Sequence, residues 1–257
     1  MVTFIDIEKK IFLGLKEACK DAFRFTGVIN EQIEPEYIVT VNIAKQLNEI
    51  NSDNSGFGTP LIIKVEEDTT TFASECVPLE LWEDIFNSKL RDAHNADRNG
   101  KIDIAVYETI VPTNFENRVP KCPIEVKKFN PPKSEIIKDL LRNLDYFKIS
   151  DKTGENRLDK AYLTCLHHDK DCLFVSNKDK GIEKAKEYYK KQTSIFAKGL
   201  KELNLKLRIE AETVEEYLFN DNDKFEGQDP DYISDRAYES FHHIGILMVI
   251  ERDVKKK

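Results

Sequence analysis

The sequence predicts an α/β fold, in which helices pack on a central β-sheet. Amphipathic helical patterns alternate along the chain with short apolar runs, which are too short for helices and typical of buried strands. The chain has 257 residues, of which 40% are hydrophobic, so it is long enough to build one large core. We therefore expect a single domain over residues 1–257.

The first part of the chain alternates helix and strand signals. Apolar residues recur every three or four positions from Asp6 to Phe25, which predicts an amphipathic helix. A second helix is expected after Pro35, which suits a first helical turn, and its apolar stripe is expected to be Tyr37, Val41, Ala44 and Leu47. A turn-rich segment then leads into a strand over 61–65, and a further helix is expected near 79–94.

The stretch Lys101–Lys128 contains two apolar runs, each with an acidic residue inside it. Because strand side chains alternate faces, Glu125 and Lys127 share one face, and Asp103 lies on the face opposite Ile104. If the two strands pair with these faces together, Asp103, Glu125 and Lys127 converge. Two carboxylates are a usual minimum for a hard cation such as Mg²⁺, and a nearby lysine can orient a metal-bound water.

The second half continues the α/β alternation. Residues 109–121, with Pro112 and Pro120, are expected to form a loop between the two acidic strands. Ser134 is a suitable N-cap for a helix whose apolar stripe is Ile137, Leu140, Leu141, Leu144 and Phe147. The remaining predicted elements are strands over 161–166 and 172–175, a long helix over 182–203, and strands over 205–209 and 244–250.

Composition limits the classes of function. The net charge is −8, but residues 178–206 hold nine lysines against four acids, so a basic surface for nucleic acid remains open. Five scattered cysteines, without paired spacing, indicate reduced thiols in the cytoplasm. The N-terminus does not resemble a signal peptide, and the longest apolar run, 244–250, is far shorter than a membrane span.

Other candidate sites are weaker. Cys165, His167, His168 and Cys172 contain zinc-binding residue types, but adjacent histidines of a strand point in opposite directions, so we interpret this segment as a surface turn. His242-His243 has the same geometry. The acidic segment 221–235 lacks the spacing of a calcium loop and is interpreted as solvated.

Asp103, followed by Glu125-Val126-Lys127, resembles the signature of the PD-(D/E)XK nuclease superfamily, which has the restriction-endonuclease-like fold. The predicted element order from about residue 35 to 175 also resembles the α-β-β-β-α-β core of that superfamily, in which helices flank a central mixed β-sheet. The resemblance implies that helix 6–25 and the extension 176–257 are additions packed on this core. Ile102 stands where the family often has proline, and 21 residues separate Asp103 from Glu125, which is a long connection.

The resemblance also implies roles for individual residues. Asp103, Glu125 and the backbone carbonyl of Val126 would hold Mg²⁺ or Mn²⁺, and Lys127 would position the attacking water. Many members add a glutamate from the helix before the first strand, and Glu36 is the nearest candidate, ahead of Glu34 and Glu49. The predicted phosphate contacts are Lys128, Lys138 and Arg142.

Two functions follow from this resemblance. The first is a cytoplasmic, Mg²⁺-dependent endonuclease that hydrolyses DNA, with RNA not excluded, in restriction or phage defence, and with a homodimer left open. The second is a nuclease-like fold without activity that acts as an interaction or regulatory module. A Glu-x-Lys triplet arises easily in a chain that is 33% charged, so the residues' positions in space are decisive.

Overall fold

The computed structural model of the chain describes residues 2–26, 36–53, 60–76, 100–109, 118–152, 158–169, 172, 174–219 and 241–253. Six strands in this part form one mixed sheet in the order β1-β2-β3-β4-β6-β5. The strands are β1 (Leu61–Asp68), β2 (Lys101–Thr109), β3 (Arg118–Phe129), β4 (Lys160–His168), β5 (Leu205–Tyr217) and β6 (Phe241–Arg252). The α/β class predicted from the sequence is therefore confirmed.

One pair of neighbouring strands is parallel and the others are antiparallel. β3 and β4 run parallel, and helix α5 (Lys133–Lys152) connects them. A parallel pair needs such a crossover, because the chain must return to the starting edge before the second strand begins. This strand-helix-strand unit carries the Glu125-Val126-Lys127 triplet on its first strand.

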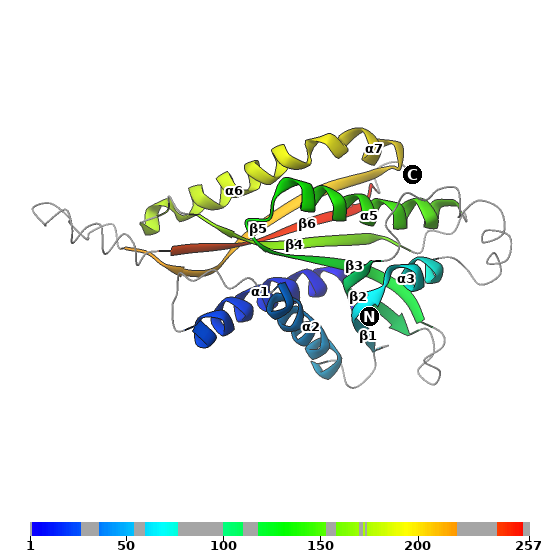
Figure 1. Ribbon diagram of the computed structural model, residues 1–257, viewed down its shortest axis with the longest axis horizontal. Coiled ribbons are helices and arrows are strands. Elements are labelled where there is room, and N and C mark those ends of the chain that lie inside the picture. The colour runs from blue at the N-terminus through cyan, green and yellow to red at the C-terminus, as the bar shows by residue number, and fades with distance from the viewer. Residues whose placement is uncertain are drawn as a thin grey trace, which may run out of the picture.

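Helices cover both faces of the sheet (Figure 1). Helices α1 (Phe4–Thr26) and α2 (Glu36–Asp53) pack on one face, and α5, α6 (Lys178–Thr193) and α7 (Ala197–Glu202) pack on the other. Two apolar clusters result, one on each side. Ile104, Ile124 and Val126 belong to the cluster under α1 and α2, as the alternation of strand side chains predicts.

Helix α1 is fixed at its start and in its middle. Thr3 and Asp6 cap its first turn reciprocally, since the Thr3 amide donates to Asp6 Oδ2 and the Asp6 amide donates to Thr3 Oγ1. Its predicted stripe is buried at Ile7, Ile11 and Leu15. Gly14 allows close approach to α2, because a Cβ there would lie 2.5 Å from the Cα of Ile43.

The expected loop over 109–121 is partly wrong, because β3 already begins at Arg118. Pro120 lies within this strand and pairs with Tyr107 of β2. The first half of β3 has no second strand partner among the described residues, since pairing with β4 starts at Ile124. A proline, which lacks the amide donor, is tolerated at such an edge.

Two predicted helix stripes are confirmed only in part, at Leu47 of α2 and at Leu140, Leu144 and Phe147 of α5. In α2, Tyr37 is 63% exposed, and the buried apolar positions are Val39, Ile43, Leu47 and Ile50. In α5, Leu141 is 47% exposed, and the buried apolar positions are Ile136, Leu140, Leu144, Tyr146, Phe147 and Ile149. Successive residues differ by about 100° around a helix, so a leucine next to a buried leucine readily faces solvent.

Three further elements differ from the prediction. The strand expected over 172–175 is a single bridge at Phe174, followed by the 3₁₀ turn η2 (Val175–Asn177). The long helix expected over 182–203 is divided into α6, a 3₁₀ turn η3 (Ser194–Phe196) and α7. A short helix, α3 (Thr69–Glu75), was not predicted, and the helix expected near 79–94 lies outside the described residues.

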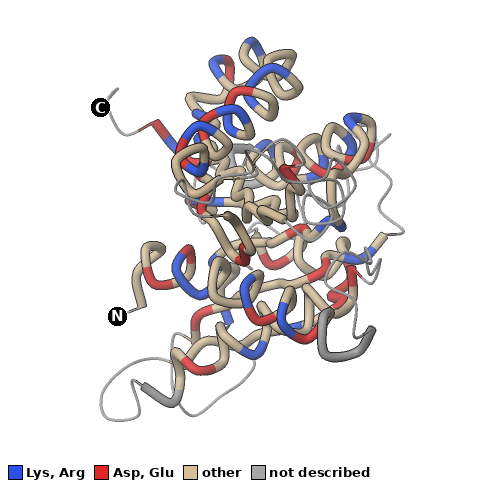
Figure 2. The backbone as a smooth tube through the Cα atoms, turned by 90° about the vertical axis from the view of Figure 1, so that its left-hand side faces the viewer, with Lys and Arg blue, Asp and Glu red and all other residues tan. Residues whose placement is uncertain are grey.

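The lysines of α6 and α7 lie among acidic residues along these helices, which form the upper layer in Figure 2. Some pair within the helix, as Lys186 does with Glu183. Other lysines of residues 178–206 pair with acids outside that range, as Lys178 does with Glu216 and Lys206 with Glu251, so part of the lysine excess is neutralised. In the described part of the chain, every helix is too short or too polar to cross a membrane.

Candidate active site

The predicted acidic residues lie where strands β2 and β3 part. The paired stretch of these strands ends at Ile104 and Ile124, so Asp103 and Glu125 are the next residues beyond it. Asp103 Oδ2 accepts a hydrogen bond from the Val126 amide at 2.7 Å. The Asp103 carboxylate thus accepts the hydrogen bond from Val126 that a backbone carbonyl would accept if the strand pairing continued. This bond directs the carboxylate towards β3.

A bulge in β3 lies at Lys127. Val126 pairs with Thr164 and Phe129 pairs with Leu166, so β3 has one residue more than β4 between these two pairs. Such bulges redirect side chains and are common beside functional sites. Lys127 Nζ lies 2.7 Å from Glu36 Oε1 on α2 and 3.1 Å from Asp139 Oδ2 on α5. One ammonium group therefore joins two helices to the sheet.

Glu125 is fully buried, with 1% of its side chain exposed. Its Oε1 accepts a hydrogen bond from Arg142 Nη1 at 3.0 Å, and Arg142 Nη2 lies 3.1 Å from Asp139 Oδ1. Arg142 also donates to the carbonyl of Lys101 at the start of β2. Arg142 thereby connects α5 to both strands that carry the acidic residues.

The two strand carboxyl groups hold a proton more tightly than free side chains do. Burial raises the pKa of Asp103, and the Val126 hydrogen bond and the charge of Lys127 only partly oppose it. Burial also raises the pKa of Glu125 well above its ordinary value, against the attraction of Arg142 and with the repulsion of Asp103 added. These groups therefore favour a nearby cation when both are ionised.

Lys127 remains charged. Burial on its own lowers the pKa of Lys127, but the negative charge of Asp139 and the hydrogen bond to Glu36 outweigh it and raise the pKa. Lys127 in this arrangement is a permanent ammonium group, suited to orienting a water or supporting negative charge. It is not a group that would accept a proton near neutral pH.

The donor set suits a hard divalent cation. Asp103 and Glu125 offer carboxylate oxygens from two adjacent strands, and Mg²⁺ binds through one or two carboxylates together with water and substrate phosphate. The predicted third ligand, the Val126 carbonyl, belongs to the residue whose amide binds Asp103. The Val126 amide and Arg142 donate hydrogen bonds to Asp103 and Glu125, respectively, and neither donor is a metal ligand. The residues present therefore fit the predicted Mg²⁺ or Mn²⁺ better than a softer metal.

Of the described glutamates predicted to complete the site from the helix before β1, Glu36 lies nearest to it. Glu36, the first residue of α2, contacts Lys127. Glu49 lies far along the same helix and pairs with Lys10 of α1 instead. Glu34 lies outside the described residues.

The predicted phosphate contacts occupy different environments. Lys128 is partly buried in β3 beside the bulge, and Lys138 is exposed on α5. Arg142 faces inward, with its guanidinium on Glu125 and Asp139. Of these three side chains, Lys138 is the most accessible to a nucleic-acid backbone.

Sequence reasoning missed Asp139, which completes the cluster. Its side chain is 4% exposed and contacts both Lys127 and Arg142. The spacing Asp139 to Arg142 places the two residues on one side of a helix, which was a usable signal. Asp139 also lies beside the apolar stripe of α5, so its direction could be known only once the phase of that helix was fixed.

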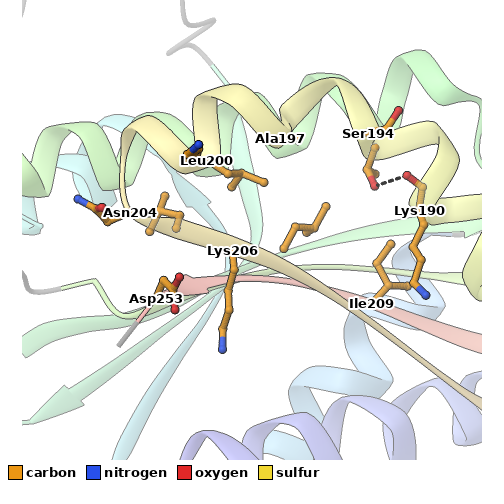
Figure 3. Close-up of a pocket in the computed structure, with 12 residues that line it drawn as sticks. Lys190, Ser194, Ala197, Leu200, Asn204, Lys206, Ile209 and Asp253 are labelled. Carbon is orange, nitrogen blue, oxygen red and sulfur yellow. Dashed lines mark hydrogen bonds between the residues drawn. The ribbon is translucent and has the colours of Figure 1, made fainter. Parts of the chain in front are cut away.

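A separate hollow lies between α6, α7 and β5 (Figure 3). Leu200 and Ile209 contribute apolar surface, and its one carboxylate, Asp253, is accompanied by lysines such as Lys190 and Lys206. It contains none of the predicted site residues. One carboxylate among lysines does not make a divalent-metal site.

Comparison of the chain with protein-family models, with curated proteins and with solved structures gave no match. The resemblance to the PD-(D/E)XK superfamily therefore rests on the residues and their arrangement alone.

Proposed function

We propose that this protein is a Mg²⁺- or Mn²⁺-dependent endonuclease of the PD-(D/E)XK type, which hydrolyses phosphodiester bonds of DNA in restriction or phage defence in the cytoplasm. The observation that supports this proposal most is the position of Asp103 and Glu125 side by side at the end of the β2–β3 ladder. A chain of ion pairs through Arg142 and Asp139 of α5 links Glu125 to Lys127 and Glu36. The order α2, β1, β2, β3, α5, β4, interrupted by α3, supports a restriction-endonuclease-like core.

The protein's own groups have distinct roles in this proposal. Asp103 and Glu125 hold the cation, with the Val126 carbonyl as the third ligand. A bound Mg²⁺ supplies Lewis-acid activation of water and neutralises charge on the phosphate. Lys127 positions the attacking water and supports the charge that develops on the non-bridging oxygens, because its ammonium is held charged by Asp139 and Glu36.

In the active state, Arg142 must release its ion pair with Glu125, so that Glu125 can bind the metal. Its guanidinium now takes one carboxylate oxygen of Glu125, at 3.0 Å, which competes with a metal for that oxygen. Asp139 offers Arg142 a second anchor on the same helix, so Arg142 can release Glu125 without becoming unpaired. When a nucleic acid is bound, the released guanidinium can contact phosphate, as the sequence predicts.

The ion pair between Arg142 and Glu125 also favours the second candidate function, an interaction or regulatory module without nuclease activity. A module without activity would have no need of a metal, and an arginine could then replace it permanently as the partner of Glu125. Lys127 would serve as a structural tie between α2 and α5. In that case, the site would hold the interaction surface in shape and would bind no divalent cation.

Plasmid cleavage tests the proposal. Wild-type protein with Mg²⁺ or Mn²⁺ is expected to nick or linearise supercoiled DNA, and chelation with EDTA is expected to stop it. Asp103→Asn, Glu125→Gln and Lys127→Met should each reduce the rate by about 100-fold or more. The control is Lys148→Met on the same helix α5, since Lys148 pairs only with the nearby Asp145 among the contacts resolved for it. Cleavage that persists at the wild-type rate in these site variants would contradict the proposal.

Binding of the nucleic acid can be examined separately. We expect Lys138→Ala to weaken DNA binding and to lower the slope of log affinity against log salt by about one unit, as loss of one phosphate contact does. The same titration with single-stranded RNA decides between the two substrates. An unchanged slope would remove Lys138 from the proposed phosphate contacts.

A further inference from the structure

A second cluster of metal-binding residue types lies at the junction of β4 and β6. It consists of Asp169, Cys172 and His242, whose donor atoms all lie within 4.8 Å of one another. Asp169 follows the last residue of β4, and its amide donates to the carbonyl of His242, the second residue of β6. The pairing of His168 with His243 extends the antiparallel ladder to this point and fixes the two residues opposite each other.

His242 presents one ring nitrogen to this cluster. The residue is fully buried. Its Nε2 lies 2.9 Å from Thr213 Oγ1 of β5, which leaves Nδ1 as the atom that faces Asp169. Nδ1 has no hydrogen-bond partner among the described residues, and Asp169 Oδ2 lies 3.7 Å away, beyond hydrogen-bond distance. A buried, unpartnered nitrogen directed at a carboxylate is the geometry expected where a cation binds between them.

The contact with Thr213 holds Nε2 of His242 and leaves Nδ1 directed at the cluster, and Thr213 Oγ1 is able to accept a hydrogen bond from Nε2. Metal-binding histidines commonly donate their second ring N–H to a nearby oxygen, which orients the ring and leaves the other nitrogen with its lone pair.

Gly181 of α6 has no side chain, and the cluster occupies the space that a side chain at this position would fill. A Cβ at this position would lie 2.3 Å from Asp169 Oδ2 and 3.2 Å from His242 Nδ1. The first turns of α6 therefore lie directly over the carboxylate and the imidazole, and a side chain at 181 would displace them. The glycine is the structural requirement for this close approach.

The combination of oxygen, sulfur and nitrogen donors selects the class of metal. Zn²⁺ and its close analogues bind carboxylate, thiolate and imidazole together, whereas Mg²⁺ and Ca²⁺ take oxygen ligands. With bonds of about 2.0–2.3 Å, the donors of a tetrahedral zinc lie roughly 3.3–3.8 Å apart. The separation of 3.7 Å between Asp169 and His242 already falls in this range, and Cys172 needs only a small movement.

We propose that Asp169, Cys172 and His242 bind a Zn²⁺-class ion, with water as the fourth ligand, and that this ion ties the end of β4 to β6 beneath α6. The site is independent of the proposed nuclease cluster, which uses other residues and a harder metal. It differs from the interpretation of the 165–172 segment as a plain surface turn, because the proposed histidine ligand is His242 and the proposed acid is Asp169. Cys165, His167 and His168 are not part of the site.

Cobalt spectroscopy tests this site without any measurement of activity. Metal-free full-length protein titrated with Co²⁺ should develop a thiolate-to-cobalt charge-transfer band that saturates at one equivalent, and Zn²⁺ should abolish it. Cys172→Ser should remove the band, whereas Cys19→Ser, which alters another buried cysteine on α1, should keep it. Asp103→Asn should also keep it, which separates this site from the proposed nuclease site.

Thermal melting provides the second measurement. Saturating Zn²⁺ should raise the melting temperature of the wild type by roughly 5–10 °C, as a ligand at about 100 times its dissociation constant does for a chain of this size. The near-isosteric Asp169→Asn should fold, as judged by circular dichroism, and show a much smaller rise. A wild type that forms no cobalt-thiolate band, or a band that persists in Cys172→Ser, would overturn the proposal.

Discussion

The carboxylate of Asp103 on β2 accepts a hydrogen bond from the backbone amide of Val126 on β3, at 2.7 Å, across the point at which the two strands part. The position of Asp103 is therefore set by main chain and not by another mobile side chain. One of its oxygens is directed at β3, beside Glu125. This relationship fixes a predicted metal ligand before any metal is present.

The first prediction uses this hydrogen bond. In Asp103→Asn, the side-chain oxygen can still accept from the Val126 amide, so the fold should be retained and the melting temperature nearly unchanged. The loss of an anionic ligand should weaken Mg²⁺ binding by about 10–100-fold, measured by calorimetry. Asp103→Ala should lose both the hydrogen bond and the metal. Wild-type affinity in Asp103→Asn would show that this carboxylate is not a ligand.

The second prediction concerns Lys127 as a tie between helices. Lys127→Met removes the ammonium beside Asp139, a side chain that is 4% exposed and would keep only Arg142 as an ionic partner. We expect a loss of about 3 kcal/mol in the free energy of unfolding, measured by urea denaturation, because a buried charge loses one of its partners. The matched control, Lys148→Met, removes an exposed pair with Asp145 and should cost less than about 0.5 kcal/mol.

The third prediction is a pH dependence that arises from Glu125. Its folded pKa is raised above the unfolded value of about 4.3, so the folded state binds the proton more tightly. Between these two pKa values the unfolded state binds fewer protons, and stability must fall as the pH rises, by up to about 1.4 kcal/mol per pH unit. The measurement is the difference in unfolding free energy between the wild type and Glu125→Gln as a function of pH. A difference that stays constant with pH would contradict a raised pKa.

Divalent metal should reverse this slope. Mg²⁺ binds the ionised carboxylates, so the stabilisation that it provides should increase with pH over the same window. Glu125→Gln should show little stabilisation by Mg²⁺ at any pH. The comparison is made by thermal melting with and without the metal.

The convergence of Asp103, Glu125 and Lys127 could be predicted because it depends on two local rules. Strand side chains alternate, and two apolar runs joined by a connection tend to pair as neighbours. The contact between Lys127 and Glu36 was not predicted, because it depends on the place at which α2 begins relative to β3. The resemblance to a known family named Glu36 only as a candidate acid of the site, and the structure pairs it with Lys127 at 2.7 Å.

The unpredicted features depend on how elements pack. The phase of α5 decides that Asp139 faces the site and that Leu141 faces solvent, and that phase is set by contacts with β4. Likewise, Asp169 and His242 are far apart in sequence and meet only because β6 pairs with β4. Neither the apolar pattern nor the motif carried information on these pairings.

The fourth prediction tests the packing of α1 on α2. Gly14→Ala should destabilise the protein by about 1–3 kcal/mol, because the added Cβ would lie 2.5 Å from the Cα and 2.8 Å from the backbone nitrogen of Ile43. Gly199→Ala on α7 is the control, since nothing lies within 4 Å of its added Cβ. That change should stabilise the protein by about 0.4–1 kcal/mol through the unfolded state. Equal effects of the two substitutions in urea denaturation would contradict the close helix contact.

The fifth prediction separates an active nuclease from a module without activity, and it depends on Arg142. The guanidinium takes the Glu125 oxygen that a metal would need, so Arg142→Gln should increase Mg²⁺ affinity if Glu125 is a ligand. A hydrogen bond to a charged group is worth about 1.5–3 kcal/mol, which corresponds to a gain of about tenfold or more.

The measurement belongs in alkaline buffer, because removal of Arg142 also removes the attraction that lowers the pKa of Glu125, and the carboxyl group must be ionised to bind metal. Lys138→Gln, four residues earlier on an exposed face of the same helix, is the control and should leave Mg²⁺ affinity unchanged. A tight metal complex that appears only in Arg142→Gln would favour the module without activity, since the arginine would then be the permanent partner of Glu125. Measurable Mg²⁺ binding in the wild type that becomes tighter in Arg142→Gln would favour the nuclease. It would show that a metal can displace Arg142 from Glu125.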